Sequence, residues 1–311
     1  MKPIYSIVVP LYNEEAVIGE SYKRLIAVME QADGPYELLF VNDGSSDNTK
    51  ALMHLICRED KRVRLLSFSR NFGHQIAITA GMEHARGQAV VVIDADLQDP
   101  PEVILQMIEK WHEGYMVVYG QRTLRKGETA FKKLTASVFY RFLRHMTDVD
   151  IPVDAGDFRL LDQKVCTALL SLPERNRYVR GLVSWVGFKQ TAVPYVREER
   201  FAGVTKYPLK KMLHFASDAL VSFSRKPLKW PTFLGGLTAV GGLGYLSALL
   251  VRMLTGSLAE GEMKLMMGIL LFALGIFMMT LGFVGAYIGR IYDEARGRPL
   301  YILEEDIGGN D

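Results

Sequence analysis

Two aspartates, Asp94 and Asp96, follow directly on a short apolar run. Residues two apart on an extended backbone point the same way, so both carboxylates are expected to face one spot. Like charges this close repel each other unless a cation lies between them. Hard divalent ions such as Mg²⁺ and Mn²⁺ prefer oxygen ligands and commonly share them with substrate phosphates. The pair therefore predicts a divalent metal ion bound to a diphosphate.

Two further polar loops, YNEE at residues 12–15 and DGSSDN at residues 43–48, also follow apolar runs. Each has an ordinary interpretation as well, because acids favour the first turn of a helix and Asp-Gly favours a tight turn. We interpret Ser46, Asp47 and Asp99 as helix caps. Asp99 stands before a Pro-Pro pair and three residues before a glutamate, which is typical of a helix start.

The polar loops can act together only if the secondary structure places them at the same edge of a sheet. Five runs rich in β-branched residues predict strands, and four segments between them predict helices. The strands are expected at 4–11, 37–42, 64–68, 89–93 and 116–119, and the helices at 15–29, 48–58, 75–85 and 102–111. This alternation predicts an α/β domain with a mostly parallel sheet. Such sheets bind ligands beyond the carboxyl ends of their strands, which is where the loops fall.

Two uncharged stretches near the C-terminus predict membrane-spanning helices. No charged residue occurs in 231–251, over 21 positions, or in 265–289, over 25 positions. About 20 apolar residues cross a bilayer, so we predict spans at 231–253 and 265–289. Basic residues flank the pair on its outer sides, which places both termini and the first 230 residues in the cytoplasm. The alternative is a pair of buried helices in a globular core.

Two basic segments are expected at the membrane surface. Residues 200–230 contain seven Lys or Arg against one Asp, which suits anionic head groups. Residues 130–146 have apolar positions at helical spacing with basic residues around them, as in an interfacial helix. An ordinary amphipathic helix on a soluble core fits that second pattern equally well. The tail 304–311 is acidic and glycine-rich, and is expected to fray.

Four segments, in this order, resemble inverting family 2 glycosyltransferases of the GT-A fold: VPLYNEE, VNDGSSDNT, SRNFGHQIAITAGMEHARG and DADLQDPPE. Three more, with the paired C-terminal stretches, resemble the polyprenyl-phosphate glycosyltransferases: DAGDFRLLD, RYVRGLVSWVGF and RFAGVTKYPLKK. That subgroup includes dolichyl-phosphate mannosyltransferases and undecaprenyl-phosphate glucosyltransferases. The resemblance covers essentially the whole chain. It implies a cytoplasmic GT-A catalytic domain at 1–200, basic juxtamembrane helices at 201–230 and a cytoplasmic tail at 290–311.

The resemblance also implies roles for individual residues. The residues implied to line the nucleoside pocket are Pro10, Tyr12, Glu14 and Asp43. The residues implied to bind the donor diphosphate and its Mg²⁺ or Mn²⁺ ion are Asp94, Asp96, Gln98 and Arg122. Asp157 occupies the position of a base or of an acid that orients the acceptor. Arg200 and Lys206 are implied to bind the acceptor phosphate.

The implied reaction moves a monosaccharide, first of all glucose from UDP-glucose, to a polyprenyl phosphate with inversion. A phosphate monoester has a second pKa of about 6, so the acceptor is mostly ionised at neutral pH. Positioning the acceptor therefore suits Asp157 at least as well as removing a proton. The expected partners are the donor, the acceptor and the bilayer, without nucleic acid; glycine-lined spans would also permit a homo-oligomer.

Several alternatives stay open. Mannose, N-acetylglucosamine, galacturonate or a modified arabinose are possible sugars in place of glucose. A transferase with a soluble or glycan acceptor would use the apolar stretches only as anchors. A non-catalytic membrane scaffold, or a partner of a lipid-sugar flippase, would keep the fold without the reaction.

Overall fold

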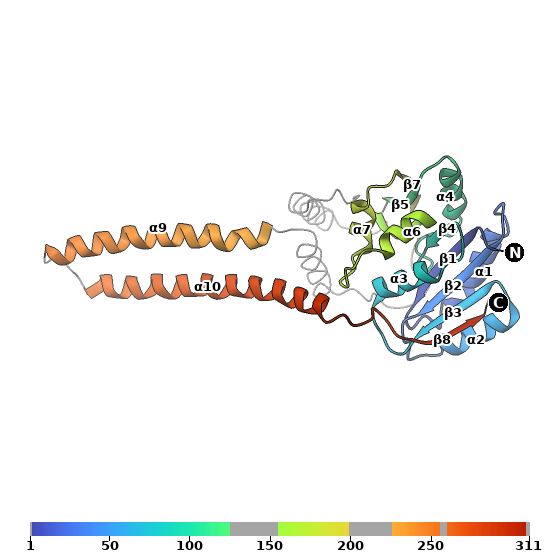
Figure 1. Cartoon of the computed structure of the whole chain (residues 1–311), viewed down its shortest axis with the longest axis horizontal. Helices are drawn as coiled ribbons and strands as arrows, with labels where there is room; N and C mark the ends of the chain where they lie inside the picture. Colours follow the sequence, from blue (N-terminus) through green and yellow to red (C-terminus); the bar gives the residue numbers. More distant parts are fainter. Residues whose placement is uncertain (1, 125–154, 199–225, 256–259, 309–311) are drawn as a thin grey trace. The chain divides into compact units, whose positions relative to one another are not determined.

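The computed structural model describes residues 2–124, 155–198, 226–255 and 260–308 (Figure 1). The chain divides into two compact units, one formed by Met1–Ala216 with Arg298–Asp311 and the other by Ser217–Gly297. The predicted interfacial helix at 130–146 and most of the basic segment at 201–230 lie outside the described residues, as do Arg200 and Lys206.

One sheet organises the described part of the first unit. Its strands are β1 Tyr5–Leu11, β2 Tyr36–Asn42, β3 Val63–Phe68, β4 Ala89–Val92, β5 Val117–Leu124, β6 Ala155–Asp162, β7 Gln190–Val196 and β8 Leu303–Gly308. Their order is β7-β5-β6-β4-β1-β2-β3-β8. Pairing is parallel for β1 with β2 and β4, for β2 with β3, and for β5 with β7. Only β6 and β8 run antiparallel to their neighbours, so the predicted mostly parallel sheet is confirmed.

Helices connect and cover these strands (Figure 1). They are α1 Ile18–Met29, α2 Thr49–Glu59, α3 His74–His84, α4 Val103–His112, α6 Gln163–Leu170 and α7 Val179–Trp185. The first four agree with the predicted helices within three residues at either end, and β1 to β4 agree with the predicted strands within one. The fifth predicted strand is longer than expected, because β5 continues to Leu124. The strand β6, inserted between β4 and β5, was not predicted.

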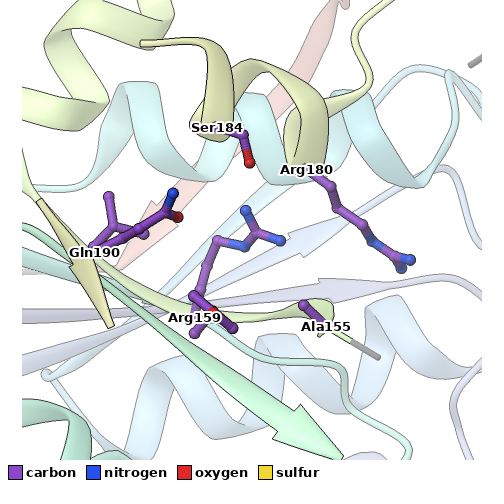
Figure 2. Close-up of a pocket in the computed structure, with 7 residues that line it drawn as sticks. Ala155, Arg159, Arg180, Ser184 and Gln190 are labelled. Atoms are coloured by element: carbon purple, nitrogen blue, oxygen red, sulfur yellow. The ribbon is translucent and has the colours of Figure 1, made fainter. Parts of the chain in front are cut away.

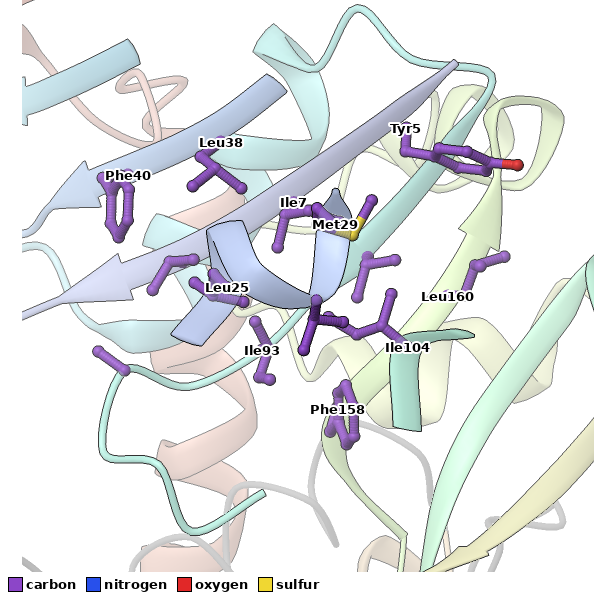
Figure 3. Close-up of a cluster of buried hydrophobic side chains, with 14 of the residues drawn as sticks. Tyr5, Ile7, Leu25, Met29, Leu38, Phe40, Ile93, Ile104, Phe158 and Leu160 are labelled. Carbon is purple, nitrogen blue, oxygen red and sulfur yellow. The ribbon is translucent and has the colours of Figure 1, made fainter. Parts of the chain in front are cut away.

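The main core lies between α1, α4 and one face of the sheet. Figure 3 shows Leu25 and Met29 of α1 among side chains from the neighbouring strands. Ile7 and Phe40 on that face are completely buried. Burying a side chain of this size contributes about 1.5–3 kcal/mol relative to leaving it exposed. The strands are therefore firmly held, and the loops at their carboxyl ends start from fixed positions.

The prediction that the tail 304–311 would fray is wrong for its described part. β8 pairs with β3 and closes that edge of the sheet. Tyr301, just before the strand, stacks on Phe68 with ring centroids 5.0 Å apart and an interplanar angle of 21°. Lys50 lies 3.0 Å from the carboxylate of Glu304. The acidic residues that suggested a solvated tail thus belong to a strand of alternating exposure, and they find cationic partners.

The second unit contains two long helices, α9 Lys226–Leu254 and α10 Glu260–Ala295. Within α10, the segment Leu265–Ala295 is long and apolar enough to cross a membrane. Within the described part of α9, Val240–Arg252 is a shorter apolar helix. The predicted span at 265–289 therefore has a matching helix, whereas the one at 231–253 stays a prediction.

Candidate active site

His74 lies between two carboxylates that come from neighbouring strands. Asp94 follows β4 and Asp157 belongs to β6, which pairs with β4. The Nε2 atom of His74 is 3.4 Å from Asp94 Oδ1 and 3.5 Å from Asp157 Oδ2. Burial alone would lower the pKa of His74, but the two carboxylates outweigh it and raise the pKa to about 9. The imidazole is therefore protonated near neutral pH, and it faces the site as well as beginning α3.

Asp157 is the most tightly held carboxylate of this cluster. Its side chain is 6% exposed, and both of its oxygens accept hydrogen bonds from Arg180 of α7, at 2.8 and 2.9 Å. Gln75 donates to Oδ2 at 3.3 Å. Burial would raise the pKa of Asp157, but Arg180 and His74 hold it well below its usual range. A carboxylate with its lone pairs engaged in this way is ionised and a poor proton acceptor.

Asp94 opens to solvent and is surrounded by negative charge. Its side chain is 33% exposed, and burial of the remainder raises its pKa to about 6. The surrounding carboxylates that act in the same direction are Asp157, Asp99 and Asp96, whereas His74 opposes them. A divalent cation bound here would relieve this repulsion, so the chemistry of the site suits the predicted metal.

Asp96 lies next to Asp94 but is more enclosed, at 9% exposure, and its Oδ1 accepts from the backbone N–H of Gln98 at 3.2 Å. The Oε1 of Gln98 accepts from Arg197 at 2.8 Å, which leaves one lone pair of this oxygen for a metal ion. Among the described residues, no three His, Cys, Asp or Glu side chains come together as a metal site. The two aspartates fit an ion whose remaining ligands arrive with the substrate.

Arg122 lies on the other face of the β5–β6 pair from Asp157. A Cβ atom on Gly156 would come within 2.6 Å of Arg122 Nη2, so Arg122 lies on the face toward which Gly156 points. Asp157 is the next residue of the strand and points to the opposite face, because consecutive strand residues alternate. The guanidinium donates to the hydroxyl of Tyr195 at 3.0 Å and lies 3.4 Å from the carboxylate of Asp99. Tyr195 also donates to Asp99. Arg122 is thus bound within the protein rather than presented freely at the loop edge.

The interpretation of Asp99 as a helix cap is wrong. Its side chain is 1% exposed and is enclosed by Arg122, Tyr195 and Arg197. Helix α4 begins only at Val103, whose N–H donates to a proline carbonyl at the start of the turn. Asn48 is the N-cap of α2, and Asp47, one residue earlier, accepts from the N–H of Thr49 at 3.0 Å.

The loops predicted for the nucleoside pocket are joined to each other. β1, which contains the buried Pro10, and β2 are parallel neighbours, so their following loops meet. Asn13 donates from its backbone to Ser45 at 3.0 Å and accepts from the N–H of Ser46 at 2.8 Å. The backbone N–H of Glu14 donates to a threonine hydroxyl of α2 at 2.9 Å. Tyr12 remains 41% exposed beside this loop pair.

Asp43 is buried at the end of β2 and fixes the segment that precedes His74. Its carboxylate accepts from the N–H of Phe72 at 2.6 Å and of Gly73 at 3.0 Å. Burial raises the pKa of Asp43, while these two bonds act in the opposite direction. In this structure Asp43 therefore orders the start of α3, and its predicted role toward a nucleoside stays a prediction.

Sequence reasoning assigned no site role to Arg180, Tyr195 or Arg197. Arg180 stands in a quoted motif, RYVRGLVSWVGF, but its partner Asp157 is 23 residues away. Tyr195 and Arg197 lie in and just after β7, and reach Asp99 only because β7 pairs with β5. The only sequence signal for a site role of Arg180 was its place in that motif. No local pattern indicated a site role for Tyr195 or Arg197.

Known proteins resemble this chain along nearly its whole length. The uncharacterized glycosyltransferase YkcC of Bacillus subtilis is 59% identical, over 98% of this chain and 94% of that protein. The SfII prophage-derived bactoprenol glucosyl transferase of Shigella flexneri is 39% identical, over 98% of this chain and 99% of that protein. A crystal structure of glucosyl-3-phosphoglycerate synthase from Mycobacterium tuberculosis matches 70% of this chain and 78% of that one, with 22% identity and a TM-score of 0.47. Because the model for glycosyl transferase family 2 also matches residues 6–170, this chain belongs to that family and is a glycosyltransferase.

Proposed function

We propose that this glycosyltransferase moves glucose from a nucleotide sugar, first of all UDP-glucose, to a polyprenyl phosphate at the cytoplasmic face of a membrane, with inversion. Relatives at 39% identity are named bactoprenol glucosyl transferases, which supports both the sugar and the lipid. The apolar segment Leu265–Ala295 supports a membrane location. The observation that carries the proposal is the placement of His74 within 3.5 Å of both Asp94 and Asp157.

In this proposal Asp94 and Asp96 hold Mg²⁺ or Mn²⁺ together with the two phosphates of the donor. The crowded, partly exposed carboxylate of Asp94 supports this assignment, because added positive charge relieves its repulsion with the neighbouring acids. Such an ion, when bound, stabilises the charge of the departing nucleoside diphosphate. Arg122 is assigned to the same diphosphate; its contacts with Tyr195 and Asp99 use Nε and Nη2.

The remaining residues of the cluster serve the attacking phosphate. The acceptor is already mostly ionised near neutral pH, so the reaction needs orientation more than proton removal. Asp157 is 6% exposed, whereas His74 and Arg180 keep 35% and 25% of their side chains exposed. Asp157 thus anchors two cations that are both partly exposed to solvent. Arg200 and Lys206 are assigned to the acceptor phosphate by the resemblance described above.

Transfer by the purified protein tests this function. The protein in detergent is given Mn²⁺, a polyprenyl phosphate and, in parallel reactions, labelled UDP-glucose and UDP-N-acetylglucosamine or GDP-mannose. We expect labelled glucose in an organic-soluble, acid-labile lipid. Label that enters only a water-soluble glycan would favour the alternative acceptor, and cellular function that survives Asp96→Asn unchanged would favour a non-catalytic scaffold.

A further inference from the structure

The side-chain amide of Gln75 joins two elements that are distant in sequence. Its Oε1 accepts from the backbone N–H of Val179, the first residue of α7, at 3.0 Å. Its Nε2 donates to Asp157 Oδ2 in β6 at 3.3 Å. A backbone N–H can only donate, so the amide oxygen must face α7 and the NH₂ group must face the carboxylate.

These bonds close a ring of contacts around Asp157. Arg180 is the second residue of α7 and binds both oxygens of Asp157. Its neighbour Val179 binds Gln75, which in turn binds Asp157. Gln75 therefore fixes the carboxylate directly, and also the helical turn from which the guanidinium reaches it.

Helix α7 packs on the domain through four buried residues, with a small gap on one side. A pocket lies between α7 and the β5–β6 pair, and its lining includes Arg159, Arg180 and Ser184 (Figure 2). The Nε atom of Arg159 is buried there without a hydrogen-bond partner in the described structure. The buried residues of α7 hold the helix on the sheet, and the polar bonds at its start add a direct constraint on the turn that carries Arg180.

We propose that Gln75 is a positioning residue for sugar transfer, which holds Asp157 and Arg180 in the geometry that the acceptor phosphate requires. This inference rests on the proposed function. The side-chain hydrogen bonds of Gln75 go to Asp157 and Val179, so we expect its effect mainly on the side of the site that faces the acceptor.

The variant Gln75→Glu tests whether position 75 must donate a hydrogen bond to Asp157. One carboxylate oxygen still accepts from Val179, while the other faces Asp157 where the NH₂ group had been. The charged groups that face this position are Asp157, His74 and Arg180. At pH 8 we expect kcat to fall about tenfold to a hundredfold, the cost of a misplaced reacting group, with an unchanged KM for the donor. At pH 6 the new glutamate regains a proton beside Asp157 and donates again, so the rate relative to wild type should rise.

Two further variants separate positioning from a general structural defect. Gln75→Met keeps the volume and removes both bonds, so its rate should fall without recovery at pH 6. Gln31→Glu makes the same chemical change at an exposed position after α1, where the side chain binds only a local carbonyl, and should behave as wild type. Thermal melting and nucleotide binding are measured for each variant.

The outcomes distinguish the two levels of the proposal. A wild-type protein that forms no labelled lipid would contradict the proposed function itself. A fully active wild type with equally active Gln75→Glu and Gln75→Met variants would overturn only the role of Gln75. A folded Gln75→Glu variant that is equally slow at pH 8 and pH 6 would contradict the proposed role of donation from position 75 to Asp157. If Gln75→Glu does not fold, a wild-type rate in Gln75→Met overturns the inference, and a slow, normally melting Gln75→Met supports it.

Discussion

Replacing Tyr301 tests whether the C-terminal segment is an integral part of the catalytic unit. The ring of Tyr301 stacks on Phe68 of β3, and its hydroxyl donates to Glu83 at 2.7 Å and lies 3.1 Å from His84 Nε2. The residue is half-buried and immediately precedes β8, which closes the edge of the sheet. Its substitution therefore weakens the attachment of a strand that sequence reasoning treated as a frayed tail.

The expected cost of Tyr301→Ala follows from these contacts. The aromatic pair contributes about 0.5–1.5 kcal/mol and a hydrogen bond about 0.5–1.5 kcal/mol. Loss of partly buried apolar surface adds about 1 kcal/mol, less than for a fully buried side chain. The total is about 2–4 kcal/mol, which corresponds to a decrease in Tm of about 5–15 °C for a domain of this size. Tyr301→Phe keeps the stack and loses only the polar contacts, so it should cost about 1 kcal/mol.

Thermal unfolding of the full-length protein in detergent, followed by intrinsic fluorescence, provides the measurement. The expected order of Tm is wild type, then Tyr301→Phe, then Tyr301→Ala. A Tyr301→Ala variant that melts with the wild type would refute the idea that the tail stabilises the sheet. A Tyr301→Phe variant as unstable as Tyr301→Ala would refute the assigned contribution of the ring stack.

Three further predictions concern the site and the same edge of the sheet. Asp96→Asn should lower kcat about a hundredfold to a thousandfold at saturating Mn²⁺ without lowering the Tm measured in a chelator, as shown by transfer assays and melting. Arg180→Met should destabilise the protein by about 2–3 kcal/mol in denaturant unfolding, because it leaves Asp157 buried without its main partner, and adding Asp157→Asn should restore part of that loss. Burial alone would raise the pKa of Glu305, but its hydrogen bond from Lys50 keeps it below the ordinary value of 4.5. The stabilisation from Glu305 is then complete above that value and lost as the pH falls through the lowered pKa, so Glu305→Gln should lose less Tm than wild type between pH 6 and pH 3.

The first four strands and helices could be predicted because each carries its own periodic signal. β1 to β4 are runs of apolar, β-branched residues, as expected for strands buried on both faces. The end of β4 also fixed where Asp94 and Asp96 would lie. Parallel pairing then brought the loops after β1 and β2 together, as the alternation of elements implied.

Two of the missed strands, β6 and β8, carry charge for specific local reasons. β6 places Asp157 and Arg159 on the face that meets α3 and α7, so its apolar run is interrupted. β8 alternates exposed acids with partly covered residues, which is difficult to distinguish from a solvated tail. Contacts that depend on long-range pairing, such as Tyr195 with Asp99, leave no trace in the local sequence.

The most direct test of the account is a crystal structure of the protein with UDP and Mn²⁺, with data collected at the manganese absorption edge. We predict one anomalous peak, with carboxylate oxygens of Asp94 and Asp96 about 2–2.6 Å away and the diphosphate completing the ligand shell. A bound nucleotide with no manganese beside these two aspartates, or with manganese held elsewhere in the protein, would contradict it.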